Sequence, residues 1–392
     1  MASESRITGN FFVCKNEVFV EGKSIGNFSS LETESDRKNL TATATVEMPF
    51  YSVAVAAAKE VSSSSVVVRE VGDYATTYVR INPDDWNIRI GARIRIYTWY
   101  EDNEQLGHKF DKVLEFDGFI RHIEGGFPTV IKCEDAAFML RFGTVNKSYG
   151  MPTKLVSLLQ EMCDISNEAF AKYRRDNGLT AEIPKLEPDG KTMDTDFILK
   201  PAASVSPYDV IERVVIGMYK LYGAVRETYD DAGKSVAYVY AGLGISDPEA
   251  PTRKLSTAVN VVGRSIVPND HLFENFNVTV RWIEGKELKS YSTGTENGIP
   301  YEIPYTPGRT AEQMKTTAKS ALAGLKANRN KGTITTLLYP TVSLFDYVDY
   351  EDTIYTTLSG RYYVIGRRLT CGKGRGYYQT ITVTNSTFLY LG

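Results

Sequence analysis

The sequence predicts a β-rich α+β protein in which two similar antiparallel β-barrel domains flank a central α+β region. Three observations lead to this class. Apolar and polar side chains alternate with a period of two near both ends of the chain, whereas the middle carries apolar residues at helical spacing. The chain also contains 25 tyrosines, a residue that favours half-buried strand surfaces and protein interfaces. We expect a first barrel over residues 1–145, the central region over 146–270, and a second barrel with one inserted helix over 271–392.

The first barrel is predicted from about six to eight short, closely spaced strands. In Trp86–Trp99 isoleucines on even positions alternate with arginines on odd ones, which indicates a strand with one buried face. Alternatively, Gly91 divides this stretch into a short strand, a turn and a longer strand. The other predicted strands are Asn10–Val20, Leu40–Pro49, Val66–Val71, Tyr74–Ile81, Leu114–Glu124 and Thr129–Glu134.

The central region combines helices with a hairpin. Pro152–Cys163 carries leucines and a methionine at i, i+3, i+4 and i+7, the apolar stripe of a surface helix. A second helix begins at Ser206, which can cap it, with Pro207 at the first helical position. Residues 175–200 are polar and interrupted by prolines, so we expect an extended excursion. Ala224–Tyr229 and Ser235–Tyr240 are predicted to form a hairpin.

Strand character returns in the last third, beginning with Phe276–Trp282. One long helix is predicted to start near Thr306-Pro307 or at Thr310, and strands resume at Gly332. The strands of the two barrels are alike in plan, although not in residue identity. The first triplet is Arg93–Trp99, Leu114–Glu124 and Thr129–Glu134, and the second is Val342–Thr357, Arg361–Thr370 and Gly376–Thr384.

Charge and apolar content exclude several classes of protein. A net charge of −3 provides no general attraction to nucleic acid or to an anionic membrane. No apolar stretch approaches the ~20 residues of a membrane span, and the first residues do not resemble a secretory signal, so we expect cytoplasmic synthesis without membrane insertion. The four cysteines are far apart in sequence, which indicates free, mostly buried thiols.

The sequence motifs provide no active site, metal site or cofactor site. The three histidines show no metal-binding spacing, and a nucleophile elbow is absent. Two glycine-rich stretches, at 242–244 and 371–376, lack the spacing of phosphate-binding loops and are interpreted as turns. We interpret the neighbouring acidic pairs as solvated turns, while an enzyme built from distant carboxylates stays open. These pairs are Asp84-Asp85, Glu101-Asp102, Glu134-Asp135, Asp230-Asp231 and Glu351-Asp352.

Two groups of cations are the candidate interface or channel-facing residues. One lies on a single predicted strand face, and the other surrounds a glycine-rich hairpin tip. Arginine is well suited to pairing with carboxylates of a neighbouring subunit, and either group could contact phosphates in a channel. A solvated surface is the alternative for both. The residues are Arg89, Arg93, Arg95, Arg367, Arg368, Lys373 and Arg375.

The order and spacing of these segments resemble the tail hub family of long-tailed bacteriophages, including the late-control hub of contractile phages and the hub portion of type VI secretion spikes. The matching segments of the first barrel are Ile90–Ile96, Phe116–Ile120 and Thr129–Asp135. Those of the second are Ala311–Lys326, Gly332–Leu338, Pro340, Phe345–Tyr350, Gly360–Val364 and Gly376–Thr380. The resemblance covers nearly the whole chain. Where the family often has Gly-Asp before the strand, this chain has Gly91-Ala92 and, in the second copy, Val348-Asp349.

The resemblance implies a structural, non-enzymatic baseplate hub. It implies a homotrimer whose two barrels per subunit alternate around a ring, joining a sixfold tail tube to a threefold spike or tip and lining the central channel. The partners would be the tail tube protein, a separate spike or tail-tip protein and, within the channel, a tape-measure protein and passing DNA. The protein would be made in the host cytoplasm and reside at the distal end of a virion tail or in a contractile injection system. Two alternatives stay open: a tail-associated cell-wall hydrolase or peptidase, and a carbohydrate-binding module of the tail tip.

Overall fold

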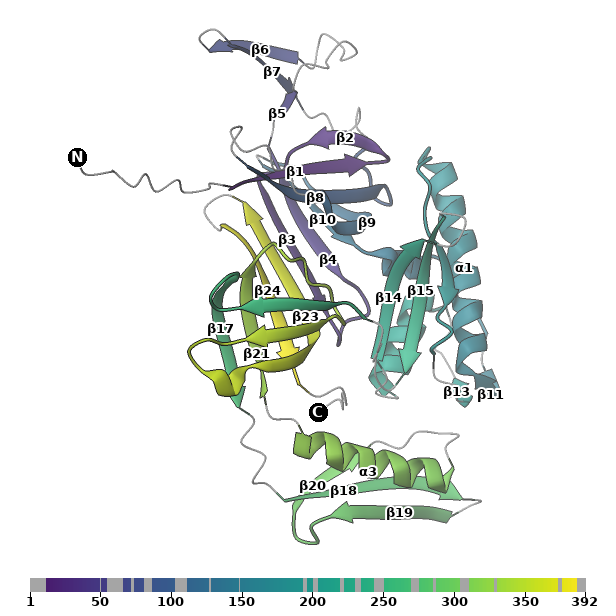
Figure 1. The fold of residues 1–392 in the computed structure, drawn as a ribbon. Helices are drawn as coiled ribbons and strands as arrows, with labels where there is room; N and C mark the ends of the chain where they lie inside the picture. The colour runs from purple at the N-terminus through teal and green to yellow at the C-terminus, as the bar shows by residue number, and fades with distance from the viewer. Residues whose placement is uncertain are drawn as a thin grey trace, which may run out of the picture.

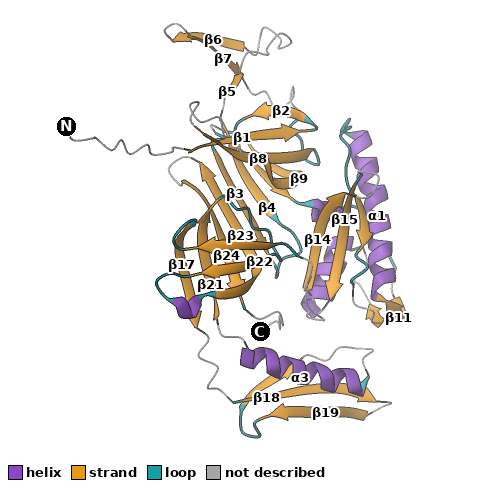
Figure 2. Cartoon of the chain, in the orientation of Figure 1, coloured by secondary structure: helices purple, strands orange, loops and turns teal. Residues whose placement is uncertain are grey.

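The computed structural model describes most of the chain. The described residues are 12–49, 51–54, 66–71, 74–80, 87–102, 111–126, 128–147, 149–192, 196–199, 204–218, 222–229, 234–242, 250–268, 275–284, 287–303, 310–327, 330–372 and 376–385. Among them, no helix is both long enough and apolar enough to cross a bilayer. Most of the regular structure is antiparallel β-sheet, which confirms the predicted β-rich class (Figure 2).

Thirteen of the described strands form one continuous sheet that has two halves. The first half, which we call the first sheet, has the order β3-β4-β10-β9-β8-β1-β2. Its strands are β1 (Phe12–Val20), β2 (Lys23–Gly26), β3 (Ser30–Asp36), β4 (Thr43–Met48), β8 (Arg93–Asp102), β9 (Val113–Glu124) and β10 (Thr129–Glu134). Alternating residues such as Val18 and Val20 of β1 turn inward and are completely buried, as a period of two requires.

The second sheet has the order β17-β21-β24-β23-β22-β16, and β23 also pairs with β3 of the first sheet. Its strands are β16 (Thr252–Ser256), β17 (Val261–Pro268), β21 (Asn330–Leu337), β22 (Tyr347–Glu351), β23 (Gly360–Gly372) and β24 (Gly376–Thr384). Both sheets are strongly curved (Figure 1). Each encloses its own apolar core, the first around Ile94, Ile96 and Ile131, the second around Ile334 and Ile381.

The central region packs against the first sheet and contains its own apolar core. Its elements are η1 (Ala136–Arg141), β11 (Tyr149–Lys154), α1 (Leu155–Asp176), β12 (Lys185–Pro188), β13 (Asp196–Leu199), α2 (Pro207–Asp209), η2 (Val210–Met218), β14 (Tyr222–Tyr229) and β15 (Ser235–Gly242). The predicted stripe of α1 is buried, and Ser206 caps α2 through the Asp209 N–H at 3.1 Å. The predicted hairpin is confirmed as the antiparallel pair β14–β15. In Figure 1 this hairpin lies alongside α1.

A separate unit of three strands and a helix is inserted between β17 and β21. It comprises β18 (Phe276–Glu284), β19 (Glu287–Gly294), β20 (Ile299–Ile303) and α3 (Ala311–Ala327). Helix α3 begins after Thr310, one of the two predicted starts, and buries Met314, Ala318 and Ala321 against β18 and β20. Figure 1 shows this unit below the second sheet, and a smaller sheet of β5 (Tyr51–Ala54), β6 (Val66–Val71) and β7 (Tyr74–Arg80) above the first.

Three sequence expectations need correction. The continuous strand predicted over Trp86–Trp99 is wrong, whereas the alternative break at Gly91 is confirmed: Gly91 has a φ of +81° in a turn, and β8 begins after it at Arg93, without a short strand at 87–90. The second sheet begins at β16, so Thr252–Pro268 belongs to it rather than to the central region. The insertion in the second sheet contains Phe276–Trp282 and two further strands, not one helix alone.

Candidate functional site

The most informative feature of the molecule is an internal duplication of strand order. The series β3-β4-β10-β9-β8 in the first sheet has the same sequence order and the same antiparallel pairings as β17-β21-β24-β23-β22 in the second. The strand triplets predicted as a repeat are the last three members of each series. The likeness therefore extends to five strands, two more than the sequence indicated.

Local irregularities recur at matching positions in the two series. The pairing of β9 with β10 skips Arg121, and the pairing of β23 with β24 skips Ile365, so each copy has a bulge at the same place. Before the preceding strand, Gly91 and Phe345 both have positive φ and both donate their N–H to the strand opposite. Phe345 therefore corresponds to Gly91, and the second-copy equivalent of Gly91-Ala92 is Phe345-Asp346, not Val348-Asp349.

The two sheets are joined by strand pairing and by a buried ion pair. Seven residue pairs link β3 to β23, from Gly366↔Asp36 to Gly372↔Ser30. Beside them, Arg367 of β23 donates to Glu115 of β9 at 2.6 Å, and the two side chains are 9% and 0% exposed. Thr98 donates a further hydrogen bond to Glu115 at 2.8 Å. The junction between the halves is thus both hydrogen-bonded and charge-compensated in the interior.

A second buried charge cluster joins the first sheet to the central region. The guanidinium of Arg93 contacts both carboxylate oxygens of Asp117 at 2.9 and 2.8 Å, and it also pairs with Glu227 of β14. It donates in addition to the carbonyl of Glu182 at 2.7 Å. Burial, followed by the charge of Asp117, raises the pKa of Glu227. Arg93 therefore connects three segments that are distant in sequence.

A third cluster fixes the end of α1. Arg174 is 3% exposed and donates to Glu21 at 3.0 Å and to the carbonyl of Gly91 at 2.7 Å. Glu21 also accepts the N–H groups of Thr180 and Ala181, each at 2.9 Å. Burial acts to raise the pKa of Glu21, but the N–H groups of Ala181 and Arg93 and the guanidinium of Arg174 outweigh it, and the pKa is lowered. Glu21 is therefore held ionised in the interior.

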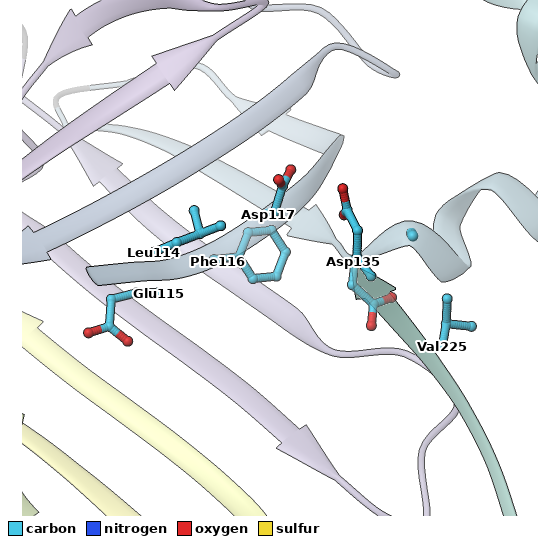
Figure 3. Close-up of a pocket in the computed structure, with 8 residues that line it drawn as sticks. Leu114, Glu115, Phe116, Asp117, Asp135 and Val225 are labelled. Carbon is cyan, nitrogen blue, oxygen red and sulfur yellow. The ribbon is translucent and has the colours of Figure 1, made fainter. Parts of the chain in front are cut away.

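One pocket of about 230 Å³ brings together carboxylates that are far apart in the sequence. Glu115, Asp117, Asp135 and Glu227 all line it, and Figure 3 labels the first three, with Glu115 and Asp117 pointing in different directions. The sequence alone left this possibility open for an enzyme. Each carboxylate is, however, already bound. Glu115 is bound by Arg367 across the junction of the two sheets, and Asp117 by arginines of the neighbouring strand β8. Glu227 is bound by Arg93 and a serine, and Asp135 by backbone N–H groups. This pattern is typical of a structural junction.

The predicted environment of two acidic pairs is wrong. Glu134-Asp135 and Glu351-Asp352 were expected to be solvated, but Glu134 and Asp352 are 2% and 1% exposed. Glu134 pairs with Arg121 and Arg141, and Asp352 pairs with Arg264 and accepts the N–H groups of the loop that follows it. Of the other pairs, 84–85 and 230–231 lie outside the described residues. An acidic residue at the end of a strand can therefore be buried when arginines pair with its carboxylate.

Asp135 is expected to make stability depend on pH. Burial raises its pKa to about 7, although the N–H groups of Ala42 and Ala137 act to lower it. The folded chain thus holds this proton more tightly than the unfolded chain, whose aspartate has a pKa of 3.8. The stabilisation is complete below about pH 4 and is lost as pH rises to about 7. Urea titrations at several pH values should show this loss in the wild type and in the exposed control Asp176→Asn, but not in Asp135→Asn. Identical pH profiles would contradict the assignment.

The candidate cations occupy different environments. Arg93 is buried, contrary to the expectation that it shares an exposed face. Arg367 is nearly buried, because it pairs with Glu115 at the junction of the two sheets. Arg95 is about one-third exposed and pairs with Asp117 at 2.9 Å. Arg89 precedes β8 and is exposed, and Arg368 is 57% exposed beside Glu32. Lys373 and Arg375 lie outside the described residues. The structure therefore brings no single cationic face together among the described candidates.

The expected state of the cysteines is confirmed. All four are free, and Cys133, Cys163 and Cys371 are buried. Within the part of the chain that the structure describes, no group of three or more His, Cys, Asp or Glu side chains is arranged to hold a metal ion.

Comparison with known proteins links this architecture to tail proteins. No family model matches the sequence, and no curated protein matches it by sequence. Among solved structures, the tail protein from Neisseria meningitidis MC58 is similar at a TM-score of 0.55, with 12% identity over 96% of this chain and 97% of that protein. The 43 kDa tail protein of prophage MuSo2 from Shewanella oneidensis is similar at 0.52, with 11% identity over 94% and 98%. The chain therefore shares the fold of these tail proteins over nearly its whole length.

Proposed function

We propose that this chain is a structural hub of a phage tail or a related injection machine, and that it works as a homotrimeric ring. The observation that carries the proposal is the internal duplication of the five-strand series. Three copies of a chain with two similar units present six similar units around one axis, while the remaining parts of the chain repeat only three times. Such a ring can bind a sixfold tail tube on one side and a threefold spike or tip on the other.

The likeness in fold to two tail proteins supports the same role. On this proposal the protein resides at the distal end of the tail, binds the tail tube protein and a spike or tip protein, and surrounds a channel for a tape-measure protein and DNA. Arg89 and Arg368, the exposed candidates, are available for contacts with partners or with the channel contents. Lys373 and Arg375 remain candidates on the sequence alone.

A non-catalytic role accords with the state of the carboxylates. General acid–base catalysis by a pair of carboxylates needs both groups to reach a substrate. In the 230 Å³ pocket each carboxylate instead accepts hydrogen bonds from arginine, serine or backbone groups of the fold itself. We therefore propose that these side chains join segments of the chain and perform no reaction.

The test is the mass of the protein in solution. Light scattering of the purified chain should give about three times the chain mass of 43.7 kDa, and mixing with its proposed tail tube and spike partners should give larger complexes. A chain that stays monomeric, both alone and with those proteins, would rule out the hub. Release of soluble fragments from peptidoglycan by the pure protein would instead favour the hydrolase.

A further inference from the structure

The outer face of the first sheet has a hollow of about 540 Å³ over the adjacent strands β4, β10 and β9 (Figure 1). Arg121, His122 and Lys132 line it, together with Glu134 and residues of β4. The three side chains that can carry positive charge are 54%, 57% and 48% exposed, in that order. Basic groups that converge from two strands on one hollow are suited to binding an anion.

The bulge in β9 is the reason that two of these groups lie together. In a regular strand, neighbouring side chains point to opposite faces. Here the pairing with β10 passes from His122 to Ile120 and skips Arg121, so the alternation is interrupted. Arg121 and His122 are consequently both exposed, and both line the hollow. Lys132 lies directly opposite His122 on β10. The bulge therefore gathers the three basic side chains on one part of the sheet.

The ion pairs already present leave these groups able to bind a further anion. Arg121 contacts the buried Glu134 through Nη1, but Arg141 also donates to both oxygens of that carboxylate, at 2.6 and 3.0 Å. Lys132 pairs with Glu124, whose side chain is 46% exposed, and ion pairs at the surface contribute little to stability. A carboxylate from outside can therefore engage Arg121 and Lys132 while Arg141 continues to compensate Glu134.

The second sheet shows that the bulge does not require these charges. The matching bulge of β23 has the same pairing with its neighbour β24. There the three basic positions are occupied by Ile365, Gly366 and Thr382. Since the same backbone irregularity forms with apolar and neutral residues, the basic side chains are a special property of the first sheet and not a condition of its fold.

The surroundings of the hollow indicate which kind of anion it accepts. Three carboxylates lie around it on the same face: Glu34 is opposite Thr43, and Glu47 and Glu124 lie on the two sides of Val130. A polyanion such as DNA, laid across this face, would meet these negative charges. A single carboxylate needs only the hollow, and its two oxygens match the fork of an arginine. The charge pattern therefore favours an acidic side chain of another protein.

We infer that this hollow binds an aspartate or glutamate side chain of a partner protein that follows the threefold symmetry of the ring. The inference rests on the proposed trimer for the number of sites. A ring of three chains contains six matching bulges, but the three in the first sheets are the ones with basic side chains. A partner that binds there distinguishes the first sheet from the second, which a contact shared by all six units does not.

The test uses a labelled tri-glutamate peptide with blocked ends, and fluorescence anisotropy at low salt measures its binding to the full-length protein. We expect one peptide per chain, and a dissociation constant that rises about tenfold in Arg121→Gln and in Lys132→Gln. Lys132→Gln leaves both arginines of Glu134 in place, so its effect separates binding from folding. Arg361→Gln is the matched control and should bind as the wild type does, because Arg361 is 62% exposed and likewise pairs with a strand carboxylate, Asp349.

The NMR signal of His122 reports where the peptide binds. The chain has three histidines, so loss of one signal in His122→Gln assigns it. A carboxylate bound beside the imidazole should shift this signal in the wild type, and about ten times more peptide should be needed for the same shift in Lys132→Gln.

Other outcomes would contradict the site in distinct ways. Two peptides per chain, or an affinity and a His122 signal that neither variant changes, would overturn the site and leave the hub intact. A single-stranded oligonucleotide that binds more tightly than the peptide, and is weakened by the same two variants, would assign the hollow to phosphate and overturn the acidic side chain as its ligand. A wild-type chain that stays monomeric with all partners would overturn the hub itself.

Discussion

Arg367→Met is expected to lower the free energy of unfolding by about 3–5 kcal/mol. The reason is that Arg367 is the charged partner of Glu115, whose side chain is 0% exposed. Among the described residues, removing the guanidinium leaves a carboxylate in the interior that accepts a hydrogen bond from the hydroxyl of Thr98 and has no cation beside it. An unpaired buried charge costs far more than the pair contributes. Urea unfolding at neutral pH measures the loss.

The neighbouring arginine provides a matched control. Arg368→Met removes a cation that is 57% exposed, and its ion pair with Glu32 lies at the surface, so we expect a change of about 0–1 kcal/mol. The double variant Arg367→Met with Glu115→Met should regain most of the stability, because it removes both charges and keeps apolar volume. Equal effects of the two single variants, or a double variant no better than Arg367→Met, would show that this ion pair is not what holds the two sheets together.

The duplication could be predicted from sequence because it depends on strand periodicity. In β24, Gln379, Ile381 and Val383 are fully buried and alternate with partly buried residues, as their spacing indicates. The same logic located β8 from its isoleucines. A period of two survives when residue identities change, since burying one face of a strand requires only apolar side chains at alternate positions. The two similar units were therefore visible without any shared identity between them.

Buried charges could not be located in this way. The pairing of β8 with β9 skips Glu115, so this residue lies at a bulge and the alternation that would place its side chain is broken there. Arg93 lies on a predicted polar face, yet it is buried because β14 and its Glu227 approach that face from the central region. The burial of Glu115 and the burial of Arg93 both depend on contacts between segments that are distant in the sequence. The sequence signal for such buried ion pairs would be arginines in strands that also contain Asp or Glu. This pattern, however, fits an exposed charged surface equally well.

The limits of the second sheet were misplaced for a similar reason. β16 pairs in parallel with β22, and β17 pairs with β21 across an insertion of three strands and a helix. Strand periodicity identifies Phe276–Trp282 as a strand, but it does not say which sheet the strand joins. β18 lies in a separate sheet because α3 covers it: Met314, Ala318 and Ala321 of this helix bury the apolar side chains of β18 and β20. A strand with a local helix to cover it does not need the main sheet.

Arg174→Met is expected to cost about 3–5 kcal/mol at neutral pH and clearly less in acid. At pH 7 the variant leaves the Glu21 carboxylate, 3% exposed, without its cation. The lowered pKa of Glu21 means that its stabilisation is present above the unfolded value of 4.5 and is lost as pH falls through the folded pKa. Without Arg174 the carboxylate binds a proton more readily, so acid should relieve the penalty.

Arg175→Met, on the exposed side of the same helix turn, should change stability little at any pH. Hydrogen exchange locates the effect: the N–H groups of Thr180 and Ala181 donate to Glu21, so they should exchange faster in Arg174→Met and not in Arg175→Met. Faster exchange confined to these amides would mean that α1 has loosened from the turn between β1 and β2 while the sheets stay intact. A penalty that is constant from pH 4 to 8 would instead mean that the variant loses packing, since packing carries no proton.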